Sequence, residues 1–251
     1  MAAGRRTDER ALHDFRQMRL EIGLIEKASG SALINLGKTK VLVGVKVEQG
    51  EPFPDTPDEG VLTVNAELVP LASPSFEPGP PNENAIELAR VVDRGIRESK
   101  AIDLKSLCIN VGRKVFVVFV DVYVLDHDGN LIDASSIASL AALLSAKIND
   151  YEVKDGEIIV KPELKPLPIQ NHPVAVTLAK IDNTLVLDPS LEEEQVMSAR
   201  LTVISDKDGQ ICAMQKGGSG SLAVEEVKQG VKLALSKAPE IRAKIAEAVT
   251  A

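Results

Sequence analysis

The chain has 251 residues, enough for one large domain or two smaller ones, and 44% of them are hydrophobic, so a sizeable core can form. Its 37 acidic and 29 basic residues give a net charge of −8, which argues against nucleic-acid binding by bulk electrostatics alone. The longest uninterrupted apolar run, 115–120, is too short to cross a membrane, and no hydrophobic segment follows the first arginines. We therefore expect a soluble, cytoplasmic protein without a secretory signal or membrane contact.

The first elements are predicted to be a short helix and then a hairpin. Thr7 and Asp8 can cap a helix that ends near Phe15. Two β-rich runs within 32–47 flank Gly37-Lys38, which predicts a tight turn between two strands. Five arginines lie in or beside this opening segment: Arg5, Arg6, Arg10, Arg16 and Arg19.

The middle of the chain alternates strands, helices and one proline-rich loop. A strand is predicted over 61–69, and the five prolines within 70–82 predict an irregular segment. Asn82 can cap a helix over 83–101, and a long β segment follows at 107–126. The next helix, over 132–148, is apolar on nearly every side, as expected of a helix buried between layers.

The last third repeats the order of strands first and helix last. Four prolines between Lys154 and Pro173 indicate a connector. We expect helices over 221–236 and again after Pro239, preceded by four strands at 174–181, 183–188, 199–205 and 210–215.

These patterns predict an α+β fold built from two similar β-then-α halves that are fused into one domain over 1–251. The N-terminal half covers about 1–153, the connector about 154–173 and the C-terminal half about 174–251.

Cysteine and histidine usage favours no metal or cofactor. Cys108 and Cys212 each adjoin an isoleucine in an apolar segment, which is typical of buried, reduced thiols. The three histidines are scattered, and the sequence has no C-x₂-C or H-x₃-H spacing, so we expect no zinc site.

Four short motifs imitate ligand sites. The Gly37-Lys38-Thr39 segment lacks the earlier glycine of a phosphate-binding P-loop, and 126–130 lacks the spacing of a calcium loop, so both are interpreted as hairpin turns. The glycines of 217–221 precede a helix and could hold phosphate, although a flexible connector fits better. The acidic run 192–194 fits either a metal site or a solvated helix start.

The helix after Asn82 carries the most suggestive pattern. Arg90, Arg94 and Arg97 are four and three residues apart, which places three guanidinium groups along one helix face. The opposite stripe is predicted to face the core, and consists of Ile86, Ala89, Val92 and Ile96. Spacing alone leaves phosphate contact and ordinary helix ion pairing equally open, because acids stand at pairing distance in Glu87–Arg90, Asp93–Arg97 and Arg94–Glu98.

Three long segments carry a resemblance to a known family. Residues 8–45 resemble the opening block of the RNase PH superfamily, and 83–104 and 122–148 resemble one branch of it, the non-catalytic RNase PH-type subunit of the archaeal exosome ring. The resemblance covers essentially the whole chain and implies an RNase PH-like (ribosomal protein S5 domain 2-like) fold.

The resemblance also identifies what this chain lacks. Phosphorolytic members bind inorganic phosphate with a segment resembling D-G-G-[ST]-R, whose arginine position is Ile137 in the segment 133–137 here. They also carry two aspartates six residues apart, at positions that hold Glu194 and Arg200 here. A guanidinium is a cation at neutral pH and cannot serve as a general acid or hold a metal ion. We therefore expect the chain to be inactive by itself.

In the architecture that the resemblance implies, catalytic and non-catalytic subunits alternate as a trimer of dimers around a channel, together with RNA-binding cap subunits. The family's L-A-R-V-V-D-R segment contacts phosphates of single-stranded RNA through two arginines, which match Arg90 and Arg94. No such role carries over to Arg97.

Two alternatives to this RNA-binding, non-catalytic role remain open. One is an active ribonuclease that uses a rearranged set of groups, such as Asp188, Glu194 and the neighbouring acids. The other is a pure scaffold that holds its partners and never touches RNA.

Overall fold

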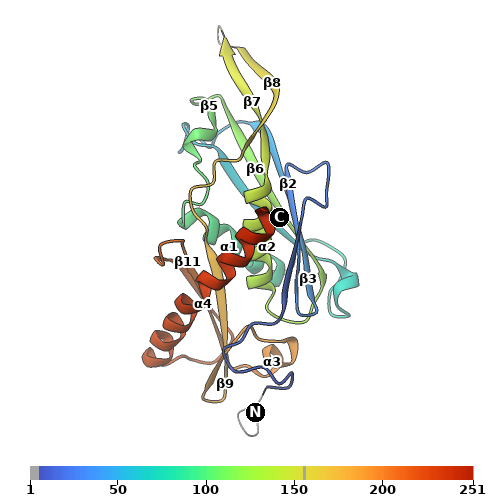
Figure 1. The fold of residues 1–251 in the computed structure, drawn as a ribbon, viewed down its shortest axis with the longest axis vertical. Coiled ribbons are helices and arrows are strands. Elements are labelled where there is room, and N and C mark those ends of the chain that lie inside the picture. Colours follow the sequence, from blue (N-terminus) through green and yellow to red (C-terminus); the bar gives the residue numbers. More distant parts are fainter. Residues whose placement is uncertain (1–5, 155–156, 251) are drawn as a thin grey trace.

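The computed structural model describes residues 6–154 and 157–250. Its first half forms one twisted sheet with the strand order β1-β2-β3-β6-β4, and β5 pairs with β6 beside this path (Figure 1). All these pairs are antiparallel except β4 with β6. The strands are β1 (Met18–Ile22), β2 (Gly30–Leu36), β3 (Thr39–Gly50), β4 (Val61–Leu68), β5 (Cys108–Asn110) and β6 (Lys114–Asp126).

The second half forms an antiparallel sheet with the order β10-β9-β11-β12. Its strands are β9 (Val174–Ile181), β10 (Thr184–Leu187), β11 (Ala199–Ser205) and β12 (Ile211–Gly217). The helices of the chain are α1 (Glu83–Glu98), α2 (Leu131–Ser145), α3 (Leu191–Val196) and α4 (Val224–Thr250), with short 3-10 turns at Pro70–Ala72 and Lys105–Leu107. The predicted α+β class with two β-and-α units is confirmed.

Helix α2 lies between the two halves and holds them together. It contacts β2 and β3 of the first sheet, β9 of the second, and helices α1 and α4. Small residues permit this close packing: a Cβ atom at Gly30 of β2 would lie 2.3 Å from the carbonyl oxygen of Ala142. The predicted burial of this helix is confirmed, and the largest buried cluster includes residues of both sheets. The single domain over 1–251, with its stated boundaries, stays a prediction.

The predicted hairpin at Gly37-Lys38 is confirmed, and its glycine is needed twice. Gly37 has a φ of +59°, a left-handed conformation that glycine adopts without strain. A Cβ atom there would also lie 2.6 Å from Cδ of Arg16. The turn is thus shaped to receive the arginine side chain of a preceding segment.

The helix predicted from Thr7 to Phe15 is wrong. Residues 6–17 form turns and irregular backbone that lead into β1. Three arginines in this segment bind groups of the second half, and these tertiary contacts override the local capping signal. Arg5 lies outside the described residues.

The segment 154–173, predicted as a proline-rich connector, contains a strand that the sequence analysis did not predict. Strands β7 (Lys147–Lys154) and β8 (Glu157–Pro166) form a two-stranded antiparallel hairpin that projects from the end of the first sheet (Figure 1). Pro162 falls inside a register shift between the pairs Asn149–Leu164 and Tyr151–Val160. An open edge and an irregularity are the places where a strand tolerates proline, which is why the prolines misled the prediction.

Two smaller predictions also need correction. The chain ends in one helix, α4, which continues through Pro239, and its buried residues lie on both sides of that proline. Cys108 and Cys212 are half-buried free thiols rather than fully buried ones. In the part of the chain that the structure describes, no helix is long and apolar enough to cross a membrane.

Candidate functional site

The start of α2 points into the protein core. Ile137 is fully buried. The Asp133 carboxylate is fully buried too and lies against β9, where Thr177 donates its backbone N–H to Oδ2 at 2.9 Å and its hydroxyl to Oδ1 at 2.7 Å. The side chain of Asn130 donates a third bond to Oδ2 at 2.9 Å. The predicted counterpart of a phosphate-binding segment therefore holds two sheets together, and no described residue pairs a cation with it.

The ionisation of Asp133 is strongly perturbed. Burial raises the pKa of its carboxyl to about 7, although hydrogen bonds from Thr177 and Asn130 oppose the shift. The nearby carboxylate of Asp188 acts in the same direction as burial. This aspartate is therefore largely protonated in weakly acidic solution.

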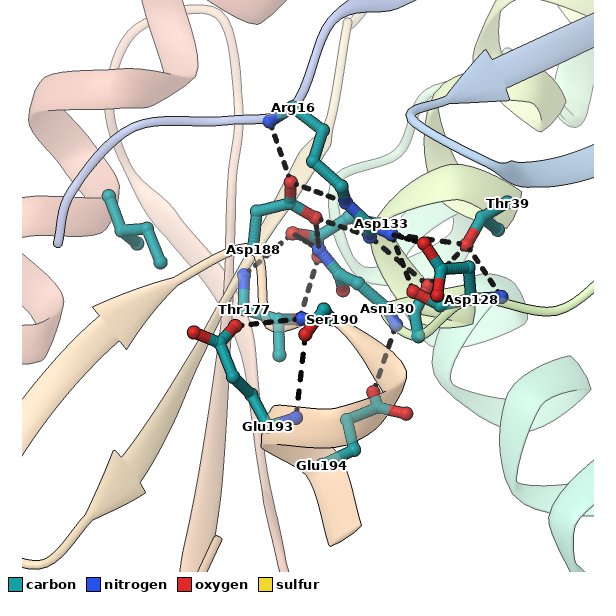
Figure 2. Close-up of polar contacts among 12 residues, drawn as sticks. Arg16, Thr39, Asp128, Asn130, Asp133, Thr177, Asp188, Ser190, Glu193 and Glu194 are labelled. Carbon is teal, nitrogen blue, oxygen red and sulfur yellow. Dashed lines mark hydrogen bonds and ion pairs between the residues drawn. The ribbon is translucent and has the colours of Figure 1, made fainter. Parts of the chain in front are cut away.

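Asp188 lies at the centre of a buried polar cluster (Figure 2). Arg16 donates to it three times: its backbone N–H (2.8 Å) and Nε (3.0 Å) to Oδ2, and Nη2 (2.8 Å) to Oδ1. Arg10 and Asn130 add bonds of 3.0 and 2.7 Å. Burial alone would raise the pKa of this carboxyl, but the bonds and charge of Arg16 hold it below its ordinary value.

The same cluster fixes neighbouring turns. Arg16 also donates to the backbone oxygens of Asp128 and Gly129, at 2.5 and 3.2 Å. The Thr39 hydroxyl donates to Gly129 at 2.7 Å and accepts from the N–H of Asp128 at 3.1 Å. The motif at 37–39 is thus a hairpin turn, as interpreted from its sequence, whereas the hairpin interpretation of 126–130 is wrong, because this turn joins strand β6 to helix α2. The two turns are tied to each other by these bonds.

The acidic run 192–194 begins helix α3. Glu193 forms a capping box with Ser190 and pairs with Arg6, whose Nε lies 2.8 Å from Oε1. Glu194 accepts the backbone N–H of Asn130 at 2.9 Å (Figure 2). Only Glu192 is exposed, so the interpretation as a solvated helix start holds for one of the three acids.

Glu194 and Arg200, the two positions where the family's acids are expected, line one cavity. Its volume is about 190 Å³, and it lies between α1, α2 and the second half of the chain. Burial raises the pKa of Glu194, although the charge of Arg200 acts against the shift. Arg200 pairs with Glu87 of α1 at 3.0 Å between Nη2 and Oε1. The cavity thus contains a cation that is already paired.

Helix α1 presents its arginines to a groove of about 420 Å³ whose walls include β4. Arg90 is exposed and makes no hydrogen bond or ion pair with any residue that the structure describes. Arg94 donates from Nη1 to the amide oxygen of Gln215 at 3.2 Å. Arg97 is held by Asp93 at 2.7 Å and by the backbone oxygen of Leu62 at 3.1 Å. The groove therefore offers one unpaired arginine and one with only a neutral partner.

Of the three ion pairs that the spacing of this helix allows, the described residues form only Asp93–Arg97. The predicted core stripe needs a correction: Ile86 is 50% exposed, because the buried face is rotated toward Ala85, Leu88 and Val91. The sequence alone missed the buried cluster around Asp188. The only feature of the sequence that pointed to this cluster was the number of arginines before the first strand. Their acidic partners lie far away in the sequence.

Comparisons with known proteins identify the family of this chain. Residues 14–149 match the family described as "3′ exoribonuclease family, domain 1", and residues 171–237 match its "domain 2". Exosome complex component Rrp42 of Pyrococcus horikoshii is 58% identical over 248 residues, which are 98% of this chain and 90% of that protein. The protein of that name from Thermococcus onnurineus is 56% identical over 250 residues, 99% and 92% of the two chains.

Solved structures give the same picture. A chain of the Archaeoglobus fulgidus exosome with RNA bound to the active site superposes with a TM-score of 0.89 at 48% identity, covering 96% of this chain and 92% of that one. Rrp46 from rice shares the fold with a TM-score of 0.75 at 17% identity, covering 97% and 100%.

Proposed function

The chain belongs to the RNase PH-type 3′ exoribonuclease family, as its resemblance predicted, and on this premise we propose that it is the non-catalytic, RNA-binding subunit of an archaeal exosome ring. The ring degrades RNA from the 3′ end by phosphorolysis. This chain alternates with a catalytic RNase PH-type partner, supports the partner's active site, and carries RNA-binding cap subunits. Single-stranded RNA is its ligand.

The absence of catalysis is supported by Ile137 above all. A phosphate dianion needs cationic or N–H donors, and a fully buried isoleucine side chain offers neither. Arg200 supports the same conclusion, because a guanidinium paired with Glu87 supplies no acid and no metal ligand.

A rearranged active site based on Asp188 finds no support. Its two carboxylate oxygens accept five hydrogen bonds in a buried cluster, from Arg10, Arg16 and Asn130. Such a carboxylate holds structure together and is closed to substrate. Glu194 does line a cavity. The other charged residue that the second half contributes to this cavity is Arg200, a cation rather than a second acid.

RNA contact is supported by the two arginines of α1. Arg90 and Arg94 line one groove, one turn apart, and carry no charged partner among the described residues. Phosphate groups of a single strand are suitable partners for such cations, and the contact carries no base specificity. Because the net charge of −8 repels RNA, local cations of this kind are what RNA contact by this chain requires.

Assembly is supported by the apolar surface of the isolated chain. Several large hydrophobic side chains are exposed, including Leu71 (75%), Val196 (65%) and Val224 (69%). Burial of these side chains against neighbouring subunits would be favourable.

The first test is activity of the chain alone. With phosphate, magnesium and a poly(A) oligonucleotide, the purified chain should release no nucleoside diphosphate. Mixed with its catalytic partner, it should form a hetero-hexamer that does. Phosphate-dependent release by the chain alone, at a rate near that of the ring, would contradict the proposal, and so would a stable monomer that ignores the partner in size-exclusion chromatography.

The second test is RNA binding by the assembled ring. Arg90→Glu/Arg94→Glu should weaken RNA binding and slow degradation without dissociating the ring. The dependence of log affinity on log salt should fall by up to about 0.7 per lost contact with a single strand. Poly(A) and mixed sequences should be affected alike.

A matched control is available on α4. Lys228→Glu/Lys232→Glu makes the same change of charge at the same spacing on another exposed helix surface. It should leave the salt dependence unchanged. If both double variants act alike, or neither acts, then α1 is no specific RNA contact, and the chain is a scaffold.

A further inference from the structure

Helix α1 carries acids beside its arginines: Asp93 and Glu98 line the groove, and Glu87 lines the neighbouring cavity that contains Arg200. Glu87 lies three residues before Arg90, and Asp93 lies between Arg90 and Arg94 in sequence. Residues three or four apart on a helix are neighbours, so Glu87 is positioned to pair with Arg90. An acid that paired with this arginine would compete with a phosphate for it.

The structure directs Glu87 elsewhere. Its Oε1 accepts Nη2 of Arg200 from β11 at 3.0 Å and Nε2 of Gln215 from β12 at 3.2 Å. Among the described residues, Glu87 is the only ion-pair partner of Arg200, and the Nε of Arg200 is buried without a hydrogen-bond partner. The guanidinium therefore has one ion pair within the described chain, with Glu87, and its charge also acts on Glu194 of the same cavity.

The same arrangement orients Arg94. Because Glu87 only accepts hydrogen bonds when ionised, the side-chain amide of Gln215 turns its NH₂ group toward Glu87. Its amide oxygen then faces the helix and accepts Nη1 of Arg94 at 3.2 Å. A chain of contacts thus runs from Arg200 through Glu87 and Gln215 to Arg94.

Asp93, an acid of the groove, is neutralised within the helix. Arg97 binds both its carboxylate oxygens, at 2.7 and 3.2 Å. Arg97 also donates to the backbone oxygen of Leu62 in β4, which fixes it in place. Glu87 and Asp93 are therefore each held by an arginine other than Arg90 and Arg94. Glu98, which also lines the groove, forms no ion pair with Arg94 among the described residues.

We propose that Arg200 is a positioning residue for RNA binding: by holding Glu87 it keeps Arg90 unpaired, and through Gln215 it orients Arg94 toward the groove. This inference rests on the RNA contact of the proposed function. It gives the arginine at position 200, where catalytic relatives are expected to carry an acid, a role of its own. Without Arg200, Glu87 turns to Arg90 and competes with RNA.

The experiment uses the assembled ring and a single-stranded oligonucleotide. Arg200→Met keeps an apolar stem and removes the cation. RNA affinity should fall about two- to fivefold, which corresponds to the free energy of one exposed ion pair. The salt dependence should shrink by up to about 0.7, because one phosphate contact is lost. Arg200→Lys, which keeps a cation beside Glu87, should retain most of the affinity.

The decisive variant is the double substitution Arg200→Met/Glu87→Gln. The neutral amide that this variant carries in place of the Glu87 carboxylate no longer competes for Arg90, so the part of the affinity and of the salt dependence that depends on Arg90 should return. A purely structural role of Arg200 predicts no such recovery, and absence of recovery in an assembled ring overturns the proposal.

Glu194 provides the matched control, because it lies in the same cavity as Arg200. Arg200→Met removes a positive charge that acts on Glu194 as well as on Glu87. Arg200→Met/Glu194→Gln should bind RNA as weakly as Arg200→Met alone. Recovery here would assign the effect to Glu194 and overturn the proposal.

The experiments on Arg200 and those on the proposed RNA contact can fail independently of each other. If Arg90→Glu/Arg94→Glu weakens RNA binding and Arg200→Met does not, the RNA contact stands and the positioning role of Arg200 falls. If the double charge reversal on α1 has no effect, the proposed RNA contact itself falls.

Discussion

The chain contains two groups of arginines that differ in what surrounds them. In the N-terminal segment, Arg6 and Arg16 are buried, and their guanidinium groups bind carboxylates and backbone oxygens of distant residues. On α1, Arg90 is exposed and unpaired within the described chain, and Arg94 has a neutral partner. The first group holds the fold together, whereas the second is available to a ligand.

The difference follows from solvation. A buried arginine is costly unless its charge and donors are matched, so Asp188 and the turn oxygens around Arg16 are as necessary as the arginine itself. An exposed arginine stays hydrated and needs no partner, so its charge remains available for a phosphate. The same residue type therefore affects stability in one region and binding in the other.

The largest expected effect comes from removing Arg16. Arg16→Leu leaves the buried carboxylate of Asp188 short of its main partner, which should cost about 3 kcal/mol or more in the free energy of unfolding. Chemical denaturation of the purified chain measures it. Arg16→Leu/Asp188→Asn should recover part of the loss, since no buried charge remains at this pair.

Arg19→Leu is the control for this experiment. Its side chain is 75% exposed and lies 3.4 Å from Glu21, so the change should stay within about 0.5 kcal/mol. Equal losses for Arg16→Leu and Arg19→Leu would contradict the division between the two groups of arginines.

The buried cluster should also give the chain an unusual pH dependence through Asp133. The pKa of this carboxyl is raised to about 7 in the folded protein from 3.8, so the folded state keeps a proton that the unfolded state releases. Its stabilising contribution is complete below the ordinary pKa and is lost as pH rises toward 7. The slope is at most about 1.4 kcal/mol per pH unit.

Asp133→Asn should remove this slope, because an asparagine can accept from Asn130 and donate to the Thr177 hydroxyl at any pH. Unfolding free energies between pH 4.5 and 8 test it. Asp58→Asn, at a carboxyl that is 53% exposed, is the control. An unchanged slope in Asp133→Asn would show that the proton is held elsewhere.

A smaller effect is expected at the start of the arginine-bearing helix. Asn82 accepts the backbone N–H of Ala85 at 3.0 Å, and Asn82→Ala should destabilise the chain by about 1 kcal/mol. Asn84→Ala, inside the same helix and exposed, lacks this capping role. Thermal and chemical denaturation should separate the two variants, and similar stabilities would argue against the cap.

The smallest effect on stability is expected at the RNA face itself. Arg90→Gln/Arg94→Gln should change the free energy of unfolding by less than about 0.5 kcal/mol, because neither side chain has a charged partner among the described residues. The same variant should weaken RNA binding by the ring. A loss of more than about 1 kcal/mol would place these arginines with the structural group instead.

Much of the fold could be predicted from local patterns. The hairpin at Gly37-Lys38, the cap at Asn82 and the buried helix α2 each depend on residues close together in the chain, whose turn, capping and burial signals are legible in sequence. The helix prediction failed at residues 7–15, where distant contacts outweighed the local signal, and strand β8 was missed within 154–173, where an open strand edge accommodates proline.

For the candidate site, the sequence by itself determined which groups are present. The spacing of Arg90 and Arg94 on one helix, and Ile137 and Arg200 where catalytic relatives carry other residues, needed no coordinates. Only the tertiary structure decided which charges are free. Glu87 and Arg90 are three residues apart on one helix, a spacing that permits an ion pair. The second sheet nevertheless brings Arg200 and Gln215 to Glu87 from more than a hundred residues away in the sequence. Helix periodicity fixes which neighbours are possible, whereas the choice among them depends on the charges that folding brings across from another element.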